Sequence, residues 1–252
     1  MSNKIGITER GDAGLDFSWR EKIWTLTNGR AILITKNLSA AFCKAVLEET
    51  AKGARLIIHA TITGLGGTFI EPNVREPDKN LHNLCALMRA GFPAENLVLR
   101  VDPIIPGYED YAFAVIDKAI ALGILPRVPC KISVLDGYKH VHLRFQDAGH
   151  PLNFTGFAPP KAVFDEINSR LGYYITMHGV NFTCCAESDL PYATKAGCVG
   201  ERECGILDVK LPTQGVNPQG RNGCLCLCEV KTELLENKRR CPHQCLYCYW
   251  HG

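Results

Sequence analysis

The cysteines of this chain gather near its carboxyl end, and their number predicts metal chemistry. Of 13 cysteines, Cys43, Cys85 and Cys130 are scattered, whereas the other ten lie between Cys184 and Cys248. An odd number of cysteines in a chain without a secretion signal makes a poor disulfide framework. Thiolates are soft ligands, so such a dense group in a reducing compartment indicates zinc or an iron–sulfur cluster.

The last twelve residues carry three of these cysteines, Cys241, Cys245 and Cys248, with the spacing C-x3-C-x2-C. Three thiolates on one short loop can bind three irons of a 4Fe–4S cluster and leave the fourth iron open. A closed zinc site needs four protein ligands. The alternative is therefore a zinc knuckle completed by His243, His251 or a distant cysteine. We predict a terminal cluster with one open iron.

Aromatic residues around these cysteines complete a recognisable motif. Tyr247 precedes the third cysteine and Tyr249 follows it, which gives C-x3-C-x-Y-C-Y. This motif resembles the cluster loop of radical S-adenosylmethionine (SAM) enzymes, most closely that of the spore photoproduct lyase-like branch. Four further blocks resemble successive strand ends of that branch: Thr35-Lys36-Asn37, Thr61-Ile62-Thr63, Glu71-Pro72 and Arg100 to Gly107.

The order of these blocks differs from the order in that branch, where the cysteine loop follows the first barrel strand. Here the loop comes last, so the resemblance implies a circularly permuted barrel. Permutation is physically tolerable where the two termini of a domain lie close together. Over about residues 31–252 the chain is similar to an uncharacterised radical-SAM-like family with this order. It departs from that family at its amino end and at residues 231–238.

The resemblance implies a defined cofactor chemistry. SAM would bind the open iron, and an electron donor would reduce the cluster to generate a radical on an unknown substrate. The branch suggests a nucleic acid or nucleobase as one substrate class, but a net charge of +2 lends no support to binding by bulk charge. Two alternatives stay open: a non-radical iron–sulfur protein for electron transfer or redox sensing, and a zinc-stabilised binding protein.

Candidate cofactor ligands lie at predicted strand ends, where β/α barrels place their active sites. Arg100 could pair with the SAM carboxylate, and Thr63 could reach its ribose. Arg100 and Asp102 could instead form a structural ion pair. The cofactor-binding candidates are Thr61, Thr63, Glu71, Arg100, Asp102 and Tyr247, and further polar candidates are Lys36, Lys131 and His178.

A second group of cysteines precedes the terminal motif: Cys184, Cys185, Cys198, Cys204, Cys224, Cys226 and Cys228. The last three alternate with leucines, so on a strand their thiols would share one face. The similar family has cysteines corresponding to Cys184 or Cys185 and to three others. We predict a second iron–sulfur cluster or a zinc ion held by Cys184, Cys198, Cys224 and Cys226, with some of the remaining thiols in the core.

The elements that must position these residues follow from the hydrophobic pattern. Short apolar runs alternate with helical patterns, which predicts βαβ units and a parallel sheet. Continuous apolar runs are typical of parallel strands buried on both faces. We predict an α/β fold, specifically a partial or full β/α barrel of the TIM type. Its strands would lie at 31–35, 55–63, 97–101, 128–134, 173–177 and 180–184, and its helices at 39–52, 77–90, 108–122 and 161–171.

The pattern divides the chain into two regions of one domain. Residues 1–183 would form the barrel core, and 184–252 a Cys-rich region that carries the cluster loop. Within it we expect metal-organised loops over 186–228 and a short helix or irregular chain over 229–240. No stretch of about 20 apolar residues predicts a membrane span. The first residues lead into no apolar signal region, so we expect a cytoplasmic protein.

Overall fold

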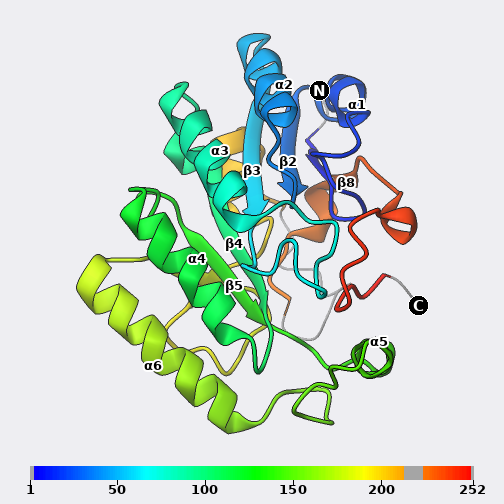
Figure 1. The fold of residues 1–252 in the computed structure, drawn as a ribbon. Helices are drawn as coiled ribbons and strands as arrows, with labels where there is room; N and C mark the ends of the chain where they lie inside the picture. The colour runs from blue at the N-terminus through cyan, green and yellow to red at the C-terminus, as the bar shows by residue number, and fades with distance from the viewer. Residues whose placement is uncertain (1–2, 213–223, 251–252) are drawn as a thin grey trace.

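A computed structural model describes residues 3–212 and 224–250, and these residues form one parallel sheet flanked by helices (Figure 1). Every neighbouring pair of its eight strands is parallel, and the order is β7-β6-β5-β4-β3-β2-β1-β8. The predicted parallel α/β sheet is confirmed. The strands are β1 (Ile5–Ile7), β2 (Arg30–Thr35), β3 (Arg55–Thr61), β4 (Leu97–Ile104), β5 (Cys130–Val134), β6 (Phe182–Cys184), β7 (Thr194–Lys195) and β8 (Lys231–Glu233).

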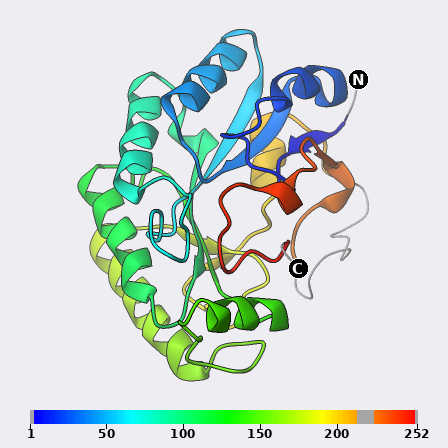
Figure 2. The ribbon, with the colours of Figure 1, turned by 45° about the vertical axis from the view of Figure 1, so that its right-hand side comes forward.

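The helices lie mainly on the outer, convex side of this curved sheet (Figure 2). The N-cap of α2 follows the sequence pattern, because the Ser39 hydroxyl accepts a hydrogen bond from the Phe42 amide. The helices are α1 (Trp19–Thr27), α2 (Ala40–Ala51), α3 (Pro77–Arg89), α4 (Glu109–Ala121), α5 (Lys139–Asp147), α6 (Lys161–His178) and α7 (Glu201–Leu207). Short 3-10 helices cover Ala94–Asn96, Cys228–Val230 and Lys238–Arg240.

The strands bury side chains on both faces, which explains their continuous apolar sequences. In β3, Leu56 and Ile58 belong to the large core under the outer helices, whereas Ile57 belongs to a second core on the inner face. Helix α7 supplies Cys204 and Leu207 to this second core. The inner face is therefore apolar near the amino ends of the strands, where α7 covers it.

The predicted strand at 173–177 is wrong, because these residues form the last turns of α6. Aromatic and β-branched residues after Gly172 favour a strand locally, and glycine inside a helix costs about 1 kcal/mol. Packing outweighs this preference: Leu171 and Tyr174 are buried at helical spacing. His178 is consequently the last residue of α6 and precedes β6, so it lies away from the carboxyl ends of the strands.

Several elements were not predicted from the hydrophobic pattern. Strand β1 and helices α1 and α5 are short and weakly patterned, and the expectation of loops throughout 186–228 overlooked β7 and α7. Residues 213–223 of that stretch lie outside the described residues. The 229–240 stretch contains a strand, β8, between two 3-10 helices. No helix of the described residues is both long and apolar enough to cross a membrane.

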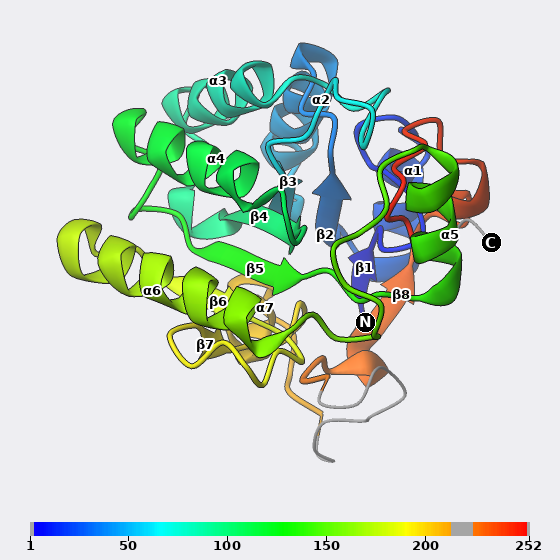
Figure 3. The same cartoon turned by 60° about the horizontal axis from the view of Figure 1, so that its bottom comes forward.

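The position of β8 decides where the C-terminal cysteines lie. Although β8 is the last strand in the chain, it pairs with β1, the first strand (Figure 3). In this pairing Ile5 lies opposite Lys231, and Ile7 lies opposite Glu233. All strands are parallel, so their carboxyl ends meet at one edge of the sheet. The chain that leaves β8 therefore starts its final loop at the same edge as the ends of β2, β3 and β4.

Candidate metal and cofactor site

A cavity of about 920 Å³ lies at the carboxyl ends of the strands. Its volume is at the upper end of the range typical of small-molecule sites. Both cysteine groups contribute to its wall, and so do polar side chains from the strand ends. The residues relevant here are Lys36, Thr61, Arg100, Asp102, Lys131, Tyr247, Cys185, Cys198, Cys224, Cys226, Cys241, Cys245 and Cys248.

A buried polar network, which we call the Glu71 anchor, fixes the terminal loop to the sheet. Lys36 Nζ lies 2.8 Å from Glu71 Oε1 and 2.6 Å from the Tyr247 hydroxyl oxygen. The Tyr247 hydroxyl donates to Glu71 Oε1, and the Thr63 hydroxyl donates to Glu71 Oε2 at 2.7 Å. Glu71 is 1% exposed. The anchor thus joins the end of β2, the segment after β3 and the cysteine loop.

The charges of the anchor are mutually stabilising. Burial alone would raise the pKa of Glu71, but the nearby Lys36 charge and three hydrogen bonds outweigh it and lower that pKa. Burial likewise opposes the charge on Lys36, yet Glu71 and then Cys245 raise the Lys36 pKa. Burial and the Glu71 carboxylate raise the pKa of Tyr247 well above 10.0. A carboxylate, an ammonium and a neutral phenol therefore coexist here.

A second contact holds the start of the loop. The His243 ring lies between two acceptors, with Nε2 2.8 Å from Asp12 Oδ2 and Nδ1 3.2 Å from the Asn73 carbonyl oxygen. Burial raises the pKa of Asp12, but hydrogen bonds from His243, Thr35 and the Lys36 amide outweigh it and lower this pKa. Both ring nitrogens of His243 are thus engaged with Asp12 and Asn73.

The loop is also held at its far end. The Asp136 amide donates to the Tyr249 hydroxyl at 2.9 Å, and the Arg144 guanidinium donates to the Cys248 carbonyl oxygen. Tyr247 and Cys245 belong to an apolar cluster with residues of the β3–α3 and β5–α5 segments. The other zinc-knuckle candidate, His251, lies outside the described residues.

The three loop cysteines line the cavity without forming a tight group. Cys245 is buried, and Cys241 and Cys248 are half-buried. Burial raises the pKa of the Cys245 thiol to about 12, although the Lys36 charge acts in the opposite direction. In the part of the chain that the structure describes, one set of three metal-ligating side chains has its ligand atoms within 4.8 Å of one another. That set does not include the loop cysteines.

The predicted pair Arg100 and Asp102 faces the cavity from β4. The Arg100 guanidinium donates to Asp102 Oδ2, and the Ser133 hydroxyl donates to Asp102 Oδ1. Burial raises the pKa of Asp102, but the Arg100 charge and these hydrogen bonds outweigh it and hold the pKa well below 3.8. Thr61 lines the same cavity, whereas Thr63 is engaged with Glu71. The two partners are charged and pre-oriented at the wall.

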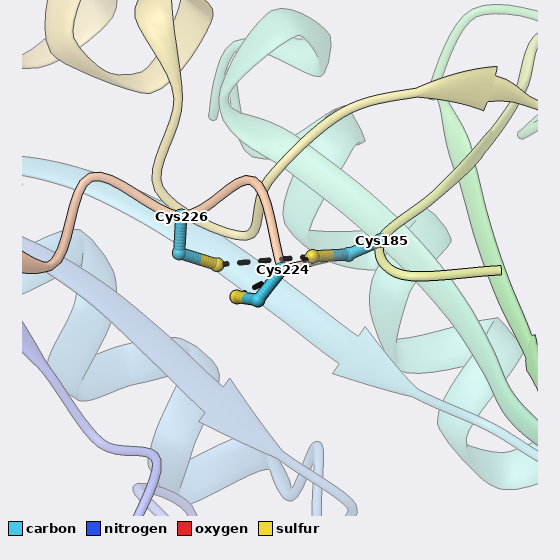
Figure 4. A group of neighbouring side chains, drawn as sticks. All are labelled: Cys185, Cys224 and Cys226. Carbon is cyan, nitrogen blue, oxygen red and sulfur yellow. Dashed lines mark hydrogen bonds between the residues drawn. The ribbon is translucent and has the colours of Figure 1, made fainter. Parts of the chain in front are cut away.

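The tight group consists of Cys185, Cys224 and Cys226 (Figure 4). The Cys185 sulfur lies 3.8 Å from the Cys224 sulfur and 4.0 Å from the Cys226 sulfur. Hydrogen bonds from the thiols of Cys185 and Cys198 lower the pKa of Cys226. These side chains could hold a metal ion. Of the four predicted ligands of the second site, Cys224 and Cys226 belong to this group, and the backbone amide of Cys198 donates to the Cys226 sulfur at 3.1 Å.

The fourth predicted ligand, Cys184, does not join them. It is fully buried in the outer core, where its thiol faces the carbonyl oxygens of Glu187 and Ala193 at 3.8 Å. Successive residues of a strand point to opposite faces, so Cys185 reaches the cavity while Cys184 cannot. Cys185 takes the place predicted for Cys184. The apolar sequence of β6, with Phe182 and Cys184 on one face, carried the signal for this assignment.

The comparisons with known proteins identify a family and nothing finer. The chain matches the family described as a domain of unknown function (DUF1848) over residues 27–250. No curated protein and no solved structure matches the chain. The matched span includes both cysteine groups and the Glu71 anchor.

Proposed function

The chain belongs to the DUF1848 family, and we propose that it is an iron–sulfur enzyme of the radical SAM type. One observation carries the proposal. The loop with Cys241, Cys245 and Cys248 follows β8, after the short 3-10 helix Lys238–Arg240, and lines a large cavity at the carboxyl ends of the strands. A cluster on this loop would therefore face a space large enough for SAM and part of a substrate.

The side chains of the loop fit a 4Fe–4S cluster with one open iron. Three cysteine side chains are available, and both ring nitrogens of the nearby His243 are already engaged. In a cubane each thiolate binds a different iron, so its ligands stand farther apart than those of a single ion. All three cysteines line the cavity, so their side chains could hold such a cluster there.

The chain's own residues would prepare this site for cofactor chemistry. When bound, a reduced cluster supplies an electron that cleaves SAM and yields a radical able to abstract hydrogen from a substrate. Cys241, Cys245 and Cys248 would hold the cluster, and the Glu71 anchor would keep the loop in place through Tyr247. Arg100 and Asp102 form a charge pair at the wall that complements the carboxylate and amino groups of SAM.

The proposal includes a circularly permuted, partial β/α barrel. In sheet order β8 precedes β1, although in chain order it follows all other strands. Cutting a barrel chain after its first strand and cluster loop, and joining the old termini, would give this arrangement. Under this reading β8 corresponds to the first strand of the barrel, and the cysteine loop follows it as it does in the spore photoproduct lyase-like branch.

Two other functions compete with this one. An iron–sulfur protein that transfers electrons or senses redox state needs no large cavity beside its cluster, and the 920 Å³ cavity favours an enzyme. A zinc-stabilised binding protein would use a closed four-ligand site.

Free thiols in such number suit a cytoplasmic location, where cysteines stay reduced. The enzyme would also need an electron donor.

The substrate class remains a hypothesis with one structural argument behind it. Aromatic side chains form part of the cavity wall: the Tyr138 and Tyr249 rings lie 4.8 Å apart, and Trp250, which follows Tyr249 in the chain, also lines the cavity. Such rings can stack on a planar group. A nucleobase, free or within a nucleic acid, is the substrate class that the resemblance suggests and these rings would accommodate.

Electron paramagnetic resonance of the reconstituted protein tests the proposal. The protein is loaded with iron and sulfide without oxygen and reduced, and its spectrum is recorded with and without SAM. We expect a reduced-cluster signal that SAM changes, because SAM would bind the open iron. Cys245→Ser should remove this signal, whereas Cys43→Ser, in α2 and away from the cavity, should not. A spectrum that SAM leaves unchanged would contradict the proposal.

A further inference from the structure

We propose that Cys185, Cys198, Cys224 and Cys226 bind one zinc ion, which joins the two edges of the open sheet. This site is separate from the terminal cysteine loop, and its existence does not depend on the radical SAM function. The inference rests on the spacing of the sulfur atoms, the hydrogen bonds around them, the charges nearby and the position of the four residues in the fold.

The spacing of the sulfur atoms fits a single tetrahedral ion. Zinc–sulfur bonds of about 2.3 Å place the sulfurs of a tetrahedral site about 3.8 Å apart. The Cys185 sulfur lies 3.8 Å from that of Cys224 and 4.0 Å from that of Cys226, and all three lie within 4.8 Å of one another (Figure 4). The thiolates of a cubane cluster bind separate irons and would be farther apart.

Cys198 supplies the fourth thiol. Its backbone amide donates to the Cys226 sulfur at 3.1 Å, and Cys198 lines the same cavity as the other three cysteines. Amide hydrogen bonds to a ligand atom orient it and spread its negative charge, as is usual in the surroundings of metal ligands. With Cys198 as the fourth ligand, the four cysteines would provide an S4 donor set, which is typical of structural zinc sites.

Positive charge lies next to this group. A zinc ion with four thiolates has a net charge of −2, so nearby cations stabilise it. Lys131, on β5, is 5% exposed, and its ammonium donates to the carbonyl oxygens of Ala196 and Gly197 at 2.9 and 3.1 Å. These two residues directly precede Cys198. The Arg100 guanidinium also interacts electrostatically with Cys198.

The backbone holds the two cysteine-bearing segments in close contact. The Leu227 amide donates to the Val199 carbonyl oxygen at 2.9 Å. A Cβ atom at Gly197 would come within 2.6 Å of the Leu225 carbonyl oxygen, so this approach requires glycine. Residues 197–199 and 225–227 therefore lie side by side, which places Cys198 next to Cys226.

The place of the four residues in the fold gives the ion a structural task. Cys185 follows β6, and Cys198 follows β7, which is one edge strand of the sheet. Cys224 and Cys226 precede β8, which is the opposite edge strand. The two edges would be joined by metal–thiolate bonds instead of by strand pairing. The ion would also fix part of the cavity wall, because all four cysteines line the cavity.

Metal analysis and X-ray absorption at the zinc edge test the proposal on the unmodified chain. We expect about one zinc per chain, bound by four sulfurs at about 2.3 Å. Cys185→Ser and Cys226→Ser should lose nearly all of this zinc. Their matched controls, Cys184→Ser and Cys228→Ser, change neighbouring cysteines outside the group and should retain it.

Three results would overturn the proposal: zinc absent from the intact protein, zinc bound mainly by nitrogen or oxygen, or equal loss from the control variants. Iron with sulfide in place of zinc at these cysteines would overturn it as well. The X-ray absorption measurement needs no variant, so misfolding of a variant cannot hide the answer. Cys245→Ser, which would remove the terminal cluster, should leave the zinc content unchanged, and this separates failure of one site from failure of the other.

Discussion

Replacing Glu71 with glutamine tests whether the Glu71 anchor holds the terminal loop as described. Glu71 and Lys36 have side chains 1% and 15% exposed, with Oε1 and Nζ 2.8 Å apart. The substitution preserves the size of the side chain but removes its charge. The Lys36 ammonium then stays buried without a counter-charge, and Tyr247 loses its charged acceptor. Both effects destabilise the folded state.

The size of the effect follows from burial. Removing one partner of a buried ion pair costs about 3–5 kcal/mol. Glutamine can still accept a hydrogen bond, so we expect the lower end, about 3 kcal/mol. For a chain of this size that corresponds to a fall in melting temperature of about 6–12 °C. Glu76→Gln is the matched control, because Glu76 is 61% exposed and pairs with an exposed Lys79. Its cost should be below about 1 kcal/mol.

Thermal unfolding of both variants across a range of pH checks the reasoning. The pKa of Glu71 is lowered in the folded protein, so the stability it contributes is present above the ordinary value of 4.5. This contribution is lost as the pH falls through the folded-state pKa. The gap between wild type and Glu71→Gln should therefore be wide at neutral pH and narrow in acid. Equal melting temperatures for Glu71→Gln and Glu76→Gln at neutral pH would refute the anchor.

Two further predictions concern a buried acid and a tight turn. Burial raises the pKa of Glu233 to about 7. The protonated carboxyl group therefore stabilises the folded protein most below pH 4.5, and this stabilisation is lost as the pH rises through 7. Glu233→Gln should therefore be more stable than wild type by about 1–2 kcal/mol near pH 8, and by little near pH 5. Thermal melts at the two pH values measure this difference, and a difference that does not change with pH would contradict the prediction. Gly64 and Gly53 both have a positive φ, of 90° and 97° respectively. A Cβ atom at Gly64 would lie 2.1 Å from a backbone oxygen of α4, whereas a Cβ atom at Gly53 would meet open space. Gly53→Ala should cost about 1 kcal/mol in urea unfolding and Gly64→Ala clearly more, and equal costs would show that the close contact is unimportant.

The sheet could be predicted from sequence wherever strands are long and mostly apolar. Strands β2, β3, β4 and β5 all lie within or beside their predicted ranges, because burial on both faces leaves an unambiguous pattern. Short edge strands leave almost none. Strand β8 is three half-buried polar residues, and only its pairing with β1 defines it. The misassigned 173–177 segment shows a strand-favouring local sequence that helical packing overrides.

The candidate site was predictable in its chemistry but only partly in its membership. Cysteine density pointed to the second group, where Cys224 and Cys226 meet Cys185, because thiolate ligands are distinctive; the cluster at Cys241, Cys245 and Cys248 stays a prediction. Cysteine density did not separate Cys184 from Cys185, since which of two adjacent residues faces the cavity depends on the register of β6. The roles of Asp12 and His243 also escaped prediction. They lie 231 positions apart in the chain, and only the fold brings them together.

The most direct test of the central claim is the detection of 5′-deoxyadenosine. The reconstituted, reduced protein is incubated with SAM without oxygen, alone and with nucleobase-containing candidate substrates, beside Cys245→Ser. The proposed function predicts 5′-deoxyadenosine from the wild-type protein and none above background from the variant. An absence of product from a wild-type protein that carries an intact 4Fe–4S cluster, or equal product from Cys245→Ser, would contradict it.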